Sequence, residues 1–346
     1  MSEFYQELSD RLSKDNFEVF NFYLKHKKAY FNQGDVTVYG EKRGGFFSKH
    51  YHIYKIIKKV RPDVIISNFS YINPAVLFGR LLGVSHNIAW FHTAFGHTKP
   101  NLLKIKNKTF YLNRANVVIA NSKQLEKEIH TVYKVPKKRT ISIPFWTNIS
   151  NYRSNSEISK IEYDFKGLSI GCPGRLVEDK NHKLAIEALY QLKKNSNQPV
   201  KLFIAGNGSY KPQLKQLVNS LNLEKDVVFL GLLNVSEMIS FYDCMDVIVL
   251  PSFHEAFGLV FIEAIALGRP VLVSKSFGSL GFIDSQKFSI DDISFNPHSV
   301  KELVSKLSMY IDEKGKQSDY FKIMYERSFE KDIIYNQVKA VILNQN

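Results

Sequence analysis

Short apolar runs alternate with segments of helical periodicity along the first half of the chain. A run of about four to eight apolar residues bounded by turns is typical of a buried strand, and apolar residues three or four apart are typical of a helix. The predicted strands are residues 17–24, 36–39, 64–67, 88–91, 117–120 and 141–143. The predicted helices are residues 46–59, 74–82, 102–112 and 123–133. This alternation predicts an α/β unit with a mostly parallel sheet and helices on both of its faces.

The same alternation begins again after a polar stretch. Residues 147–162 are rich in Asn, Ser, Arg and Glu, and we interpret them as a linker between two domains. A second α/β series runs from Leu168 to about Tyr320, and a final helix is predicted at 332–343. The predicted parts are an N-terminal domain at 1–150, a second domain at 151–328 and a C-terminal helix at 329–346.

The segment that follows the apolar run Val247–Leu250 carries the strongest functional pattern. The run predicts a buried strand, and a polar loop with Glu255 follows it. Gly258 opens an apolar stretch of helical spacing, with Glu263 about two turns inside and a second strand, Val271–Ser274, after it. One carboxylate is therefore expected in the loop and the other on the inward side of the helix.

Two carboxylates around a helix N-terminus suit a sugar nucleotide. Each carboxylate can accept two strong hydrogen bonds from neighbouring hydroxyls. The amides of residues 257–259 point out of the first helical turn, where an anion such as a diphosphate is favoured. The alternative is that Glu255 and Glu263 are solvated surface charges, which the apolar neighbours of Glu263 disfavour.

These residues resemble the E-x7-E signature of retaining glycosyltransferase family four. The matching blocks are Pro251-Ser, Glu255-x-Phe257-Gly258-Leu259, Glu263-Ala, Gly268-x-Pro270-Val, Gly174-Arg175-Leu176 with Lys180, Leu202–Gly208 and Val227–Gly231. They stand in the family's order over roughly residues 167–275. The resemblance implies the GT-B fold, in which two Rossmann-like domains face each other across a cleft and a C-terminal helix crosses back to the first domain.

The resemblance also implies roles for individual residues. The catalytic residues would be Glu255, Arg175, Lys180 and His92, and the donor-binding residues would be Gly174, Gly206, Leu232, Phe257, Gly258, Leu259 and Glu263. Fixed cations stabilise the negative charge that builds up on a departing nucleoside diphosphate. The family needs no divalent ion, and the chain has no Asp-x-Asp motif in this region, so neither metal nor cofactor is expected.

Two histidines, His92 and His97, lie where a predicted strand of the first domain runs into a loop. Ligands of open α/β sheets bind at this end of the strands. The family often keeps a histidine here near the donor sugar, and His92 is our choice, although a histidine packed at a strand end is the alternative.

The first domain departs from the family at its start. Relatives open with a strand and a Gly-Gly loop before the first helix, whereas this sequence begins at the predicted helix 2–13. Gly44-Gly45 comes too late in the order to be that loop. A reduced domain, a longer natural chain and a partner chain that completes the sheet all remain open.

Charge is distributed unevenly over the 346 residues. Residues 1–150 hold 24 Lys and Arg against 10 Asp and Glu, which accounts for the whole net charge of +14. Exposed-looking aromatic and aliphatic residues are interleaved with these cations. Such a surface suits an anionic membrane, where each basic residue contributes about 1 kcal/mol. A solubilising surface, an acidic polymer and a nucleic acid are the alternatives, of which we favour the membrane.

The remaining composition points to the cytoplasm. Cys172 and Cys244 lie in or beside apolar runs, so we expect reduced core thiols and no disulfide or metal site. The polar, acidic start carries no signal peptide, and no apolar run reaches the roughly 20 residues that span a bilayer. We predict a cytoplasmic protein that is peripheral on the inner face of the plasma membrane.

Taken with the resemblance, these features predict a metal-independent, retaining hexosyltransferase of surface polysaccharide synthesis. It would move a sugar from a nucleoside-diphosphate sugar to a glycan or lipid-linked acceptor, and no nucleic-acid partner is expected. The alternatives are a non-catalytic or partner-dependent GT-B subunit, and a sugar-nucleotide epimerase or phosphorylase on the same architecture.

Overall fold

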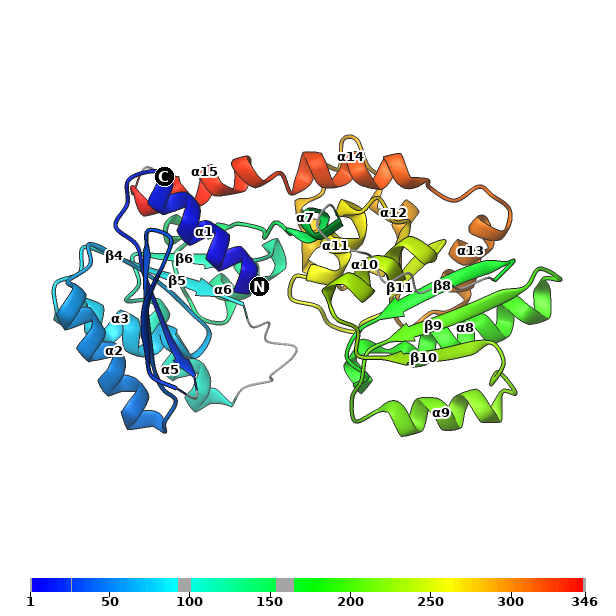
Figure 1. Ribbon diagram of the computed structural model, residues 1–346, viewed down its shortest axis with the longest axis horizontal. Coiled ribbons are helices and arrows are strands. Elements are labelled where there is room, and N and C mark those ends of the chain that lie inside the picture. The colour runs from blue at the N-terminus through cyan, green and yellow to red at the C-terminus, as the bar shows by residue number, and fades with distance from the viewer. Residues whose placement is uncertain (1, 26, 93–100, 154–164, 345–346) are drawn as a thin grey trace. The chain divides into compact units, whose positions relative to one another are not determined.

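The computed structural model describes residues 2–25, 27–92, 101–153 and 165–344. The chain divides into two compact units (Figure 1). Unit 1 is Met1–Phe145 with Lys331–Asn346, and unit 2 is Trp146–Glu330. The domain boundaries that we predicted from the sequence lie at residues 150 and 328, and they remain predictions. The α/β class with two Rossmann-like units is confirmed.

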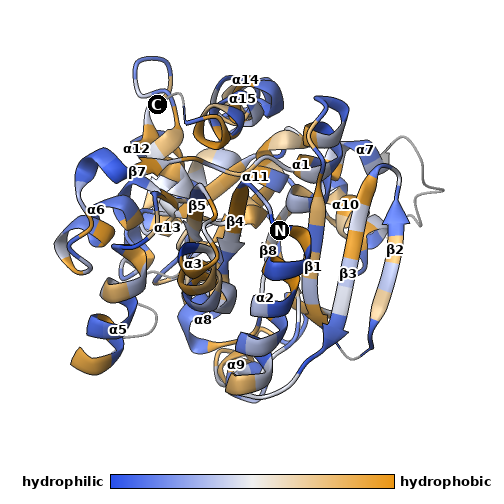
Figure 2. Cartoon of the chain, turned by 90° about the vertical axis from the view of Figure 1, so that its left-hand side faces the viewer, coloured by the Kyte–Doolittle hydropathy of each residue, from blue (hydrophilic) through white to orange (hydrophobic). Residues whose placement is uncertain are grey.

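Unit 1 contains two sheets. Its elements are α1 (Ser2–Lys14), β1 (Phe20–Lys25), β2 (Ala29–Gln33), β3 (Val36–Lys42), α2 (Phe46–Val60), β4 (Val64–Asn68), α3 (Ile72–Leu81), β5 (His86–Phe91), α5 (Leu102–Leu112), β6 (Val117–Ala120), α6 (Lys123–Thr131), β7 (Thr140–Ser142) and α15 (Lys331–Ile342). The first sheet has the order β1-β3-β2, and the second, β4-β5-β6-β7, is parallel throughout. Figure 2 shows β3 between β1 and β2.

The single sheet predicted for the first half is therefore wrong for the described residues. Among them, β1 pairs only with β3 and β4 only with β5, so no described strand joins the two sheets. The edge strands β1 and β4 of the two sheets still share one apolar cluster. In it, Phe22 of β1 and Ile65 of β4 pack against the cluster that contains Ile53 and Ile57 of α2. Packing through helices thus holds the two sheets in one unit.

The C-terminal helix α15 packs in unit 1 against α1. Tyr335 donates a hydrogen bond of 2.6 Å to Asp15, and Lys339 pairs with the same carboxylate at 2.6 Å. On the same helix, the backbone carbonyl of Val341 lies 3.0 Å from the ring nitrogen Nε2 of buried His86 on β5. These contacts join α15 to the α1 segment and to β5.

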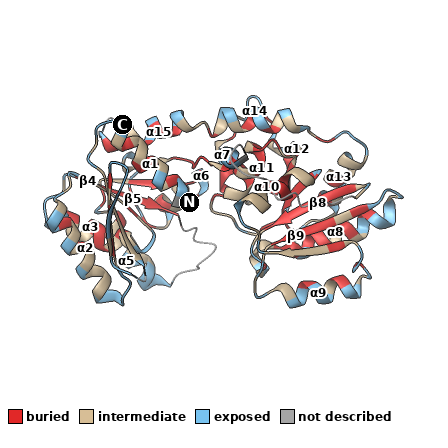
Figure 3. Cartoon of the chain, viewed as in Figure 1, coloured by how far each residue is buried: buried red, intermediate tan, exposed pale blue. Residues whose placement is uncertain are grey.

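Unit 2 contains one parallel sheet of six strands. Its elements are α7 (Ile149–Arg153), β8 (Leu168–Pro173), α8 (His182–Asn195), β9 (Val200–Ala205), α9 (Lys211–Ser220), β10 (Val227–Gly231), α10 (Val235–Cys244), β11 (Val247–Leu250), α11 (Leu259–Ala266), β12 (Val271–Ser274), α12 (Ile290–Ile293), β13 (Ser294–Phe295), α13 (Val300–Ile311) and α14 (Ser318–Ser328). The strand order is β10-β9-β8-β11-β12-β13. The strands β8 and β11 are buried along their whole length, as Figure 3 shows.

The predicted linker is only partly correct. Its described start forms α7, which packs on α10 and α11 of unit 2 and buries Ile149. Residues 154–162 of the prediction lie outside the described residues. Polar composition suggested a loop here because a five-residue helix is too short to show helical periodicity.

Both cysteines are free thiols, as predicted, and Cys172 is fully buried in β8. Burial raises the pKa of the Cys172 thiol, so it stays protonated near neutral pH. Among the described residues, no helix combines the length and hydropathy that crossing a bilayer requires.

Candidate functional site

The candidate residues of unit 2 follow the carboxyl ends of its parallel strands. The chain winds from β8 outward to β9 and β10, then returns to the other side of β8 with β11, β12 and β13. Strand order therefore reverses between β8 and β11, which is where ligands of open α/β sheets bind. Arg175 and Lys180 lie in the loop after β8, and Glu255 lies in the loop after β11.

Glycines let the loops after β8 and β9 approach closely. Gly174 has φ +156° and Gly206 has φ +143°. Residues other than glycine rarely adopt this backbone conformation. A Cβ on Gly206 would stand 1.9 Å from the carbonyl oxygen of Gly174. The amide of Gly174 donates to Ala205 O at 2.9 Å and fixes this contact. Arg175 follows directly and is exposed, with no ion pair to any described residue.

Lys180 and Glu255 form a salt bridge across the switch point. Their side chains are only 19% and 20% exposed, so water screens the pair weakly. The next residue, Asn181, anchors this segment, because its side-chain amide donates hydrogen bonds to the backbone carbonyls of Pro251 at 3.1 Å and Pro297 at 2.9 Å. The structure thus brings together two predicted residues that lie 75 positions apart.

The loop with Glu255 leads into α11 through Gly258, whose φ is +97°. A Cβ here would lie 2.3 Å from the ring of Phe277 and 3.1 Å from Cγ of Glu255. The backbone amide of Gly278 donates a hydrogen bond of 3.0 Å to the backbone carbonyl of Glu255. Leu259 opens the helix, and amides of a first helical turn have no helical carbonyl to bond. A helix start, a position that favours an anion, therefore lies next to the Lys180–Glu255 pair.

Three other predicted donor-binding residues have different surroundings. Glu263, half-buried on α11, lies 3.4 Å from the hydroxyl of Tyr242. Burial, with Glu263 as a second cause, raises the pKa of that tyrosine, which is therefore a neutral donor. The Phe257 side chain is buried, so only its backbone is suited to donor contact. Leu232 is exposed in the loop after β10.

In unit 1, His92 follows β5 and lies in an aromatic environment. Its ring nitrogen Nε2 is 2.9 Å from the Tyr5 hydroxyl of α1, and its ring is tilted against Phe69 at 4.7 Å. Burial lowers the pKa of His92 to about 3, so the imidazole is neutral near pH 7. His97 lies outside the described residues.

His182, the first residue of α8, is not among the residues that the sequence pattern singled out. Its ring is buried, and both ring nitrogens lack a hydrogen-bond partner among the described residues. A Cβ on Gly174 would lie 3.6 Å from this ring. Burial, and to a smaller extent Lys180, lowers the pKa of His182 to about 4. Its position in the helix's first turn was the only available signal.

The depressed pKa of His182 predicts an acid-sensitive unit 2. In the unfolded chain a histidine binds its proton near pH 6.5, whereas folded His182 binds it only near pH 4. Its contribution to stability is therefore present above pH 6.5 and falls as the pH drops toward 4. At pH 5 the loss is about 2 kcal/mol. Urea unfolding at pH 7 and pH 5 should show a smaller pH difference for His182→Leu than for wild type. Equal differences in both proteins would contradict the prediction.

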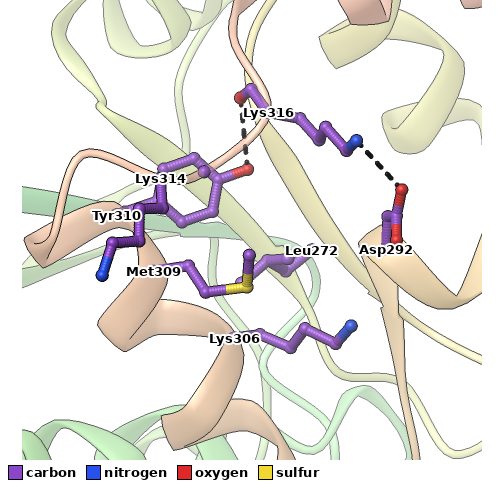
Figure 4. A pocket seen from close by; sticks show the side chains of 8 residues that line it. Leu272, Asp292, Lys306, Met309, Tyr310, Lys314 and Lys316 are labelled. Atoms are coloured by element: carbon purple, nitrogen blue, oxygen red, sulfur yellow. Dashed lines mark hydrogen bonds and ion pairs between the residues drawn. The ribbon is translucent and has the colours of Figure 1, made fainter.

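A small pocket of unit 2 lies away from these residues, between β12, α12 and α13 (Figure 4). Its cations are already engaged, since Lys316 pairs with Asp292 at 3.1 Å and Lys306 donates to the carbonyl of Asp291. None of the predicted site residues lines it. Among the described residues, no group of three or more His, Cys, Asp and Glu side chains could hold a metal ion.

Two family models match the chain. The model of glycosyl transferases group 1 matches residues 157–327, and that of Glycosyltransferase Family 4 matches residues 1–150. The crystal structure of Anabaena HepE in complex with UDP aligns with a TM-score of 0.72 at 18% identity, covering 89% of this chain and 86% of that one. The fold is therefore the GT-B fold, and the two halves of the chain are similar to the Glycosyltransferase Family 4 and group 1 glycosyl transferase models, respectively.

Curated relatives align less completely. An uncharacterized glycosyltransferase of Methanocaldococcus jannaschii is 31% identical over 192 residues, which cover 53% of this chain and 48% of that protein. The alpha-monoglucosyldiacylglycerol synthase of Streptococcus pneumoniae is 26% identical over 205 residues, 54% of this chain and 45% of that protein. The chain thus spans about half the length of these two relatives.

Proposed function

We propose that the chain transfers a hexose from a nucleoside-diphosphate sugar to a glycan or lipid-linked acceptor, with retention of the anomeric configuration. The observation that carries this proposal is the Lys180–Glu255 pair at the switch point of the unit 2 sheet. Arg175 is exposed in the same segment between β8 and α8 as Lys180. Those groups and the α11 amides together offer two cations, one carboxylate and an anion-binding helix start, which match a diphosphate joined to a polyol.

In the proposed reaction the bond between the anomeric carbon and the diphosphate oxygen breaks, and the diphosphate keeps the electron pair. Arg175, Lys180 and the amides of Gly258 and Leu259 stabilise this developing charge. The acceptor hydroxyl forms the new bond on the face that the diphosphate leaves, and its proton passes to a diphosphate oxygen. Glu255 holds sugar hydroxyls and Glu263 holds the ribose, so neither is assigned covalent attack. Gly174, Gly206 and Leu232 line the donor, and His92 donates a hydrogen bond to the substrate.

The proposed function is tested by titrating the chain calorimetrically with UDP, GDP and ADP in the presence of EDTA. Binding of one nucleotide in the micromolar range supports the donor site without a metal ion or cofactor. The matching nucleotide sugars are then offered with acceptors, and the anomeric configuration of the product is read by NMR. Absence of binding to all three nucleotides would contradict the proposal and favour the partner-dependent subunit.

We further propose that unit 1 docks on an anionic membrane during surface polysaccharide synthesis. The docking surface is defined by Phe46 and Phe47 at the start of α2 and by Leu102 and Leu103 at the start of α5, all exposed. Phe47 is 84% and Leu103 is 76% exposed. Apolar side chains of this size that are surrounded by lysines suit the boundary between headgroups and acyl chains.

Two half-buried lysines on α2 and α5 add positive charge to the helices that carry the docking surface. Lys108 of α5 donates to Asn73 of α3 at 3.1 Å, and burial, with Lys49 of α2 as a second cause, lowers its pKa to about 8. Lys49 is thus close enough to Lys108 to repel it, and neither forms a salt bridge with an acid of the described residues. A phosphate of an anionic lipid would relieve this repulsion.

The docking proposal predicts that Phe47→Asp with Leu103→Asp weakens binding to phosphatidylglycerol vesicles at least tenfold. Each substitution removes about 2 kcal/mol of apolar burial and adds a negative charge. Sedimentation with phosphatidylglycerol and phosphatidylcholine vesicles measures the effect. The matched control is Leu81→Asp at the C-terminal end of α3, which is outside the docking surface. The Leu81 side chain is 70% exposed. Equal binding of wild type and the double variant would contradict docking through this surface.

A further inference from the structure

The loops after β8 and β11 contact each other through consecutive residues, and the Lys180–Glu255 salt bridge is one of several such contacts. The backbone amide of Phe253 donates a hydrogen bond of 2.9 Å to the backbone carbonyl of Asp179. The next residue, His254, places its ring nitrogen Nδ1 2.8 Å from the carboxylate oxygen Oδ1 of the same aspartate. Asp179 and His254 thus form a second side-chain pair, one position before the salt bridge in each loop.

The proton in the Asp179–His254 contact belongs to the histidine. An ionised carboxylate carries no hydrogen and can only accept, so Nδ1 of His254 donates. The His254 side chain is 53% exposed and that of Asp179 is 32% exposed. A pair with this much exposure contributes little to the stability of a fold, because water competes for both partners. The contact is better suited to setting the spacing of the two loops than to stabilising unit 2.

The loop after β11 is fixed differently on its other side. There, the backbone amides of Gly278 and Ser279 donate hydrogen bonds of 3.0 Å to the backbone carbonyls of Glu255 and Phe257, respectively. These bonds hold the main chain of the loop against the segment after β12. On the side that faces the loop after β8, both Glu255 and His254 make their contacts through side chains. The spacing on this side therefore depends on side-chain pairs.

The proposed donor would open one of these two pairs. In the proposed function, Lys180 turns to the diphosphate and Glu255 turns to the sugar hydroxyls, so their direct contact has to open. The Asp179–His254 pair has no part in the proposed donor contacts and can persist. It would then hold the two loops at an unchanged spacing while the neighbouring salt bridge gives way to the substrate.

We propose that Asp179 and His254 are positioning residues, whose contact keeps Glu255 at the distance from Lys180 that the sugar of the donor requires. The inference rests on the proposed function, because the ligand is taken to be a nucleoside-diphosphate sugar. A nucleoside diphosphate without its sugar uses Lys180 but not Glu255. Its binding should therefore depend little on the Asp179–His254 pair, whereas binding of the complete donor should depend on it strongly.

The test compares His254→Ala with His254→Asn. Asparagine carries a side-chain N–H close to the position of Nδ1 in histidine, so it can still donate to Asp179. Calorimetry in EDTA measures the binding of UDP, GDP and ADP, and of UDP-glucose, GDP-mannose and ADP-glucose. In His254→Ala we expect affinity for the nucleotide sugar to fall about fivefold or more, and affinity for the matching diphosphate to change less than about twofold. His254→Asn should restore both affinities.

Lys193→Ala is the matched control. Lys193 forms a salt bridge with Asp226, which precedes β10 at the opposite end of the same strands, and the two side chains are 38% and 17% exposed. Loss of this pair should leave both affinities at the wild-type level. Equal weakening of both ligands in His254→Ala would indicate a merely structural role and overturn the proposal. Unchanged affinity for the nucleotide sugar, or no rescue by His254→Asn, would also overturn it.

Hydrogen exchange of the Phe253 amide tests the pair without any ligand. This amide donates to Asp179, so its exchange, followed by NMR, should be about fivefold faster or more in His254→Ala and as slow as in wild type in His254→Asn. Equal rates in the three proteins would overturn the proposal. A wild-type chain that binds no nucleotide and no nucleotide sugar would instead refute the proposed function, while the exchange rates would still decide whether Asp179 and His254 fasten the two loops.

Discussion

Lys180→Ala is expected to lower the transfer rate at least 100-fold and to abolish nucleotide binding in the micromolar range. The substitution removes a cation from the proposed diphosphate site, where one fixed charge contributes on the order of 10²–10³ to the rate. It also leaves the carboxylate of Glu255, 20% exposed, without its partner and next to the position of the bound diphosphate. Calorimetry and initial rates with the preferred nucleotide sugar measure both effects.

Lys183→Ala provides the control for Lys180. This neighbouring lysine pairs with Glu187 along α8 at 3.6 Å and is largely exposed, so its loss should change the rate less than twofold. A second comparison adds Glu255→Ala. If the pair acts as one unit, the double variant should be about as slow as the slower single variant. A Lys180→Ala protein with near-wild-type turnover would refute the assigned site.

Much of unit 2 could be predicted from the sequence because its strands are continuous apolar runs. Val247–Leu250 and Val271–Ser274 are β11 and β12 to the residue, and the predicted helix between them is α11. Buried parallel strands lack polar alternation, which makes such runs easy to recognise. The motif also singled out Lys180 and Glu255, but not their salt bridge. That contact depends on β8 and β11 being neighbours, a long-range feature with no local signal.

What was missed has weak local patterning. The edge strand β2 is mostly exposed and carries no alternation into a core, so no hydrophobic period marks it. Tyr5 and His92 lie 87 positions apart, and only the packing of α1 across β5 brings them together. The sheet of unit 1 was predicted as one because each strand was recognised separately, whereas pairing between β1 and β4 is a tertiary property.

Gly206→Ala is expected to destabilise unit 2 by about 2–6 kcal/mol. The alanine would be held at φ +143°, a strained backbone conformation that costs on the order of 1–3 kcal/mol. Its Cβ would also stand 1.9 Å from Gly174 O, and relieving that overlap costs a further 1–3 kcal/mol or so. The obstacle is backbone and cannot rotate away. The loop with Arg175 must shift, so nucleotide affinity should fall as well.

Gly231→Ala separates the two causes. Gly231 also has a positive φ, +81°, but a Cβ there meets nothing within 4 Å. Only the conformational cost of about 1–2 kcal/mol should appear. Urea unfolding of the two variants therefore isolates the steric contribution as their difference. Equal destabilisation in both would mean that the loops after β8 and β9 are not in contact. A larger loss in Gly206→Ala, together with lost nucleotide binding, would connect the close approach of these loops to the diphosphate site.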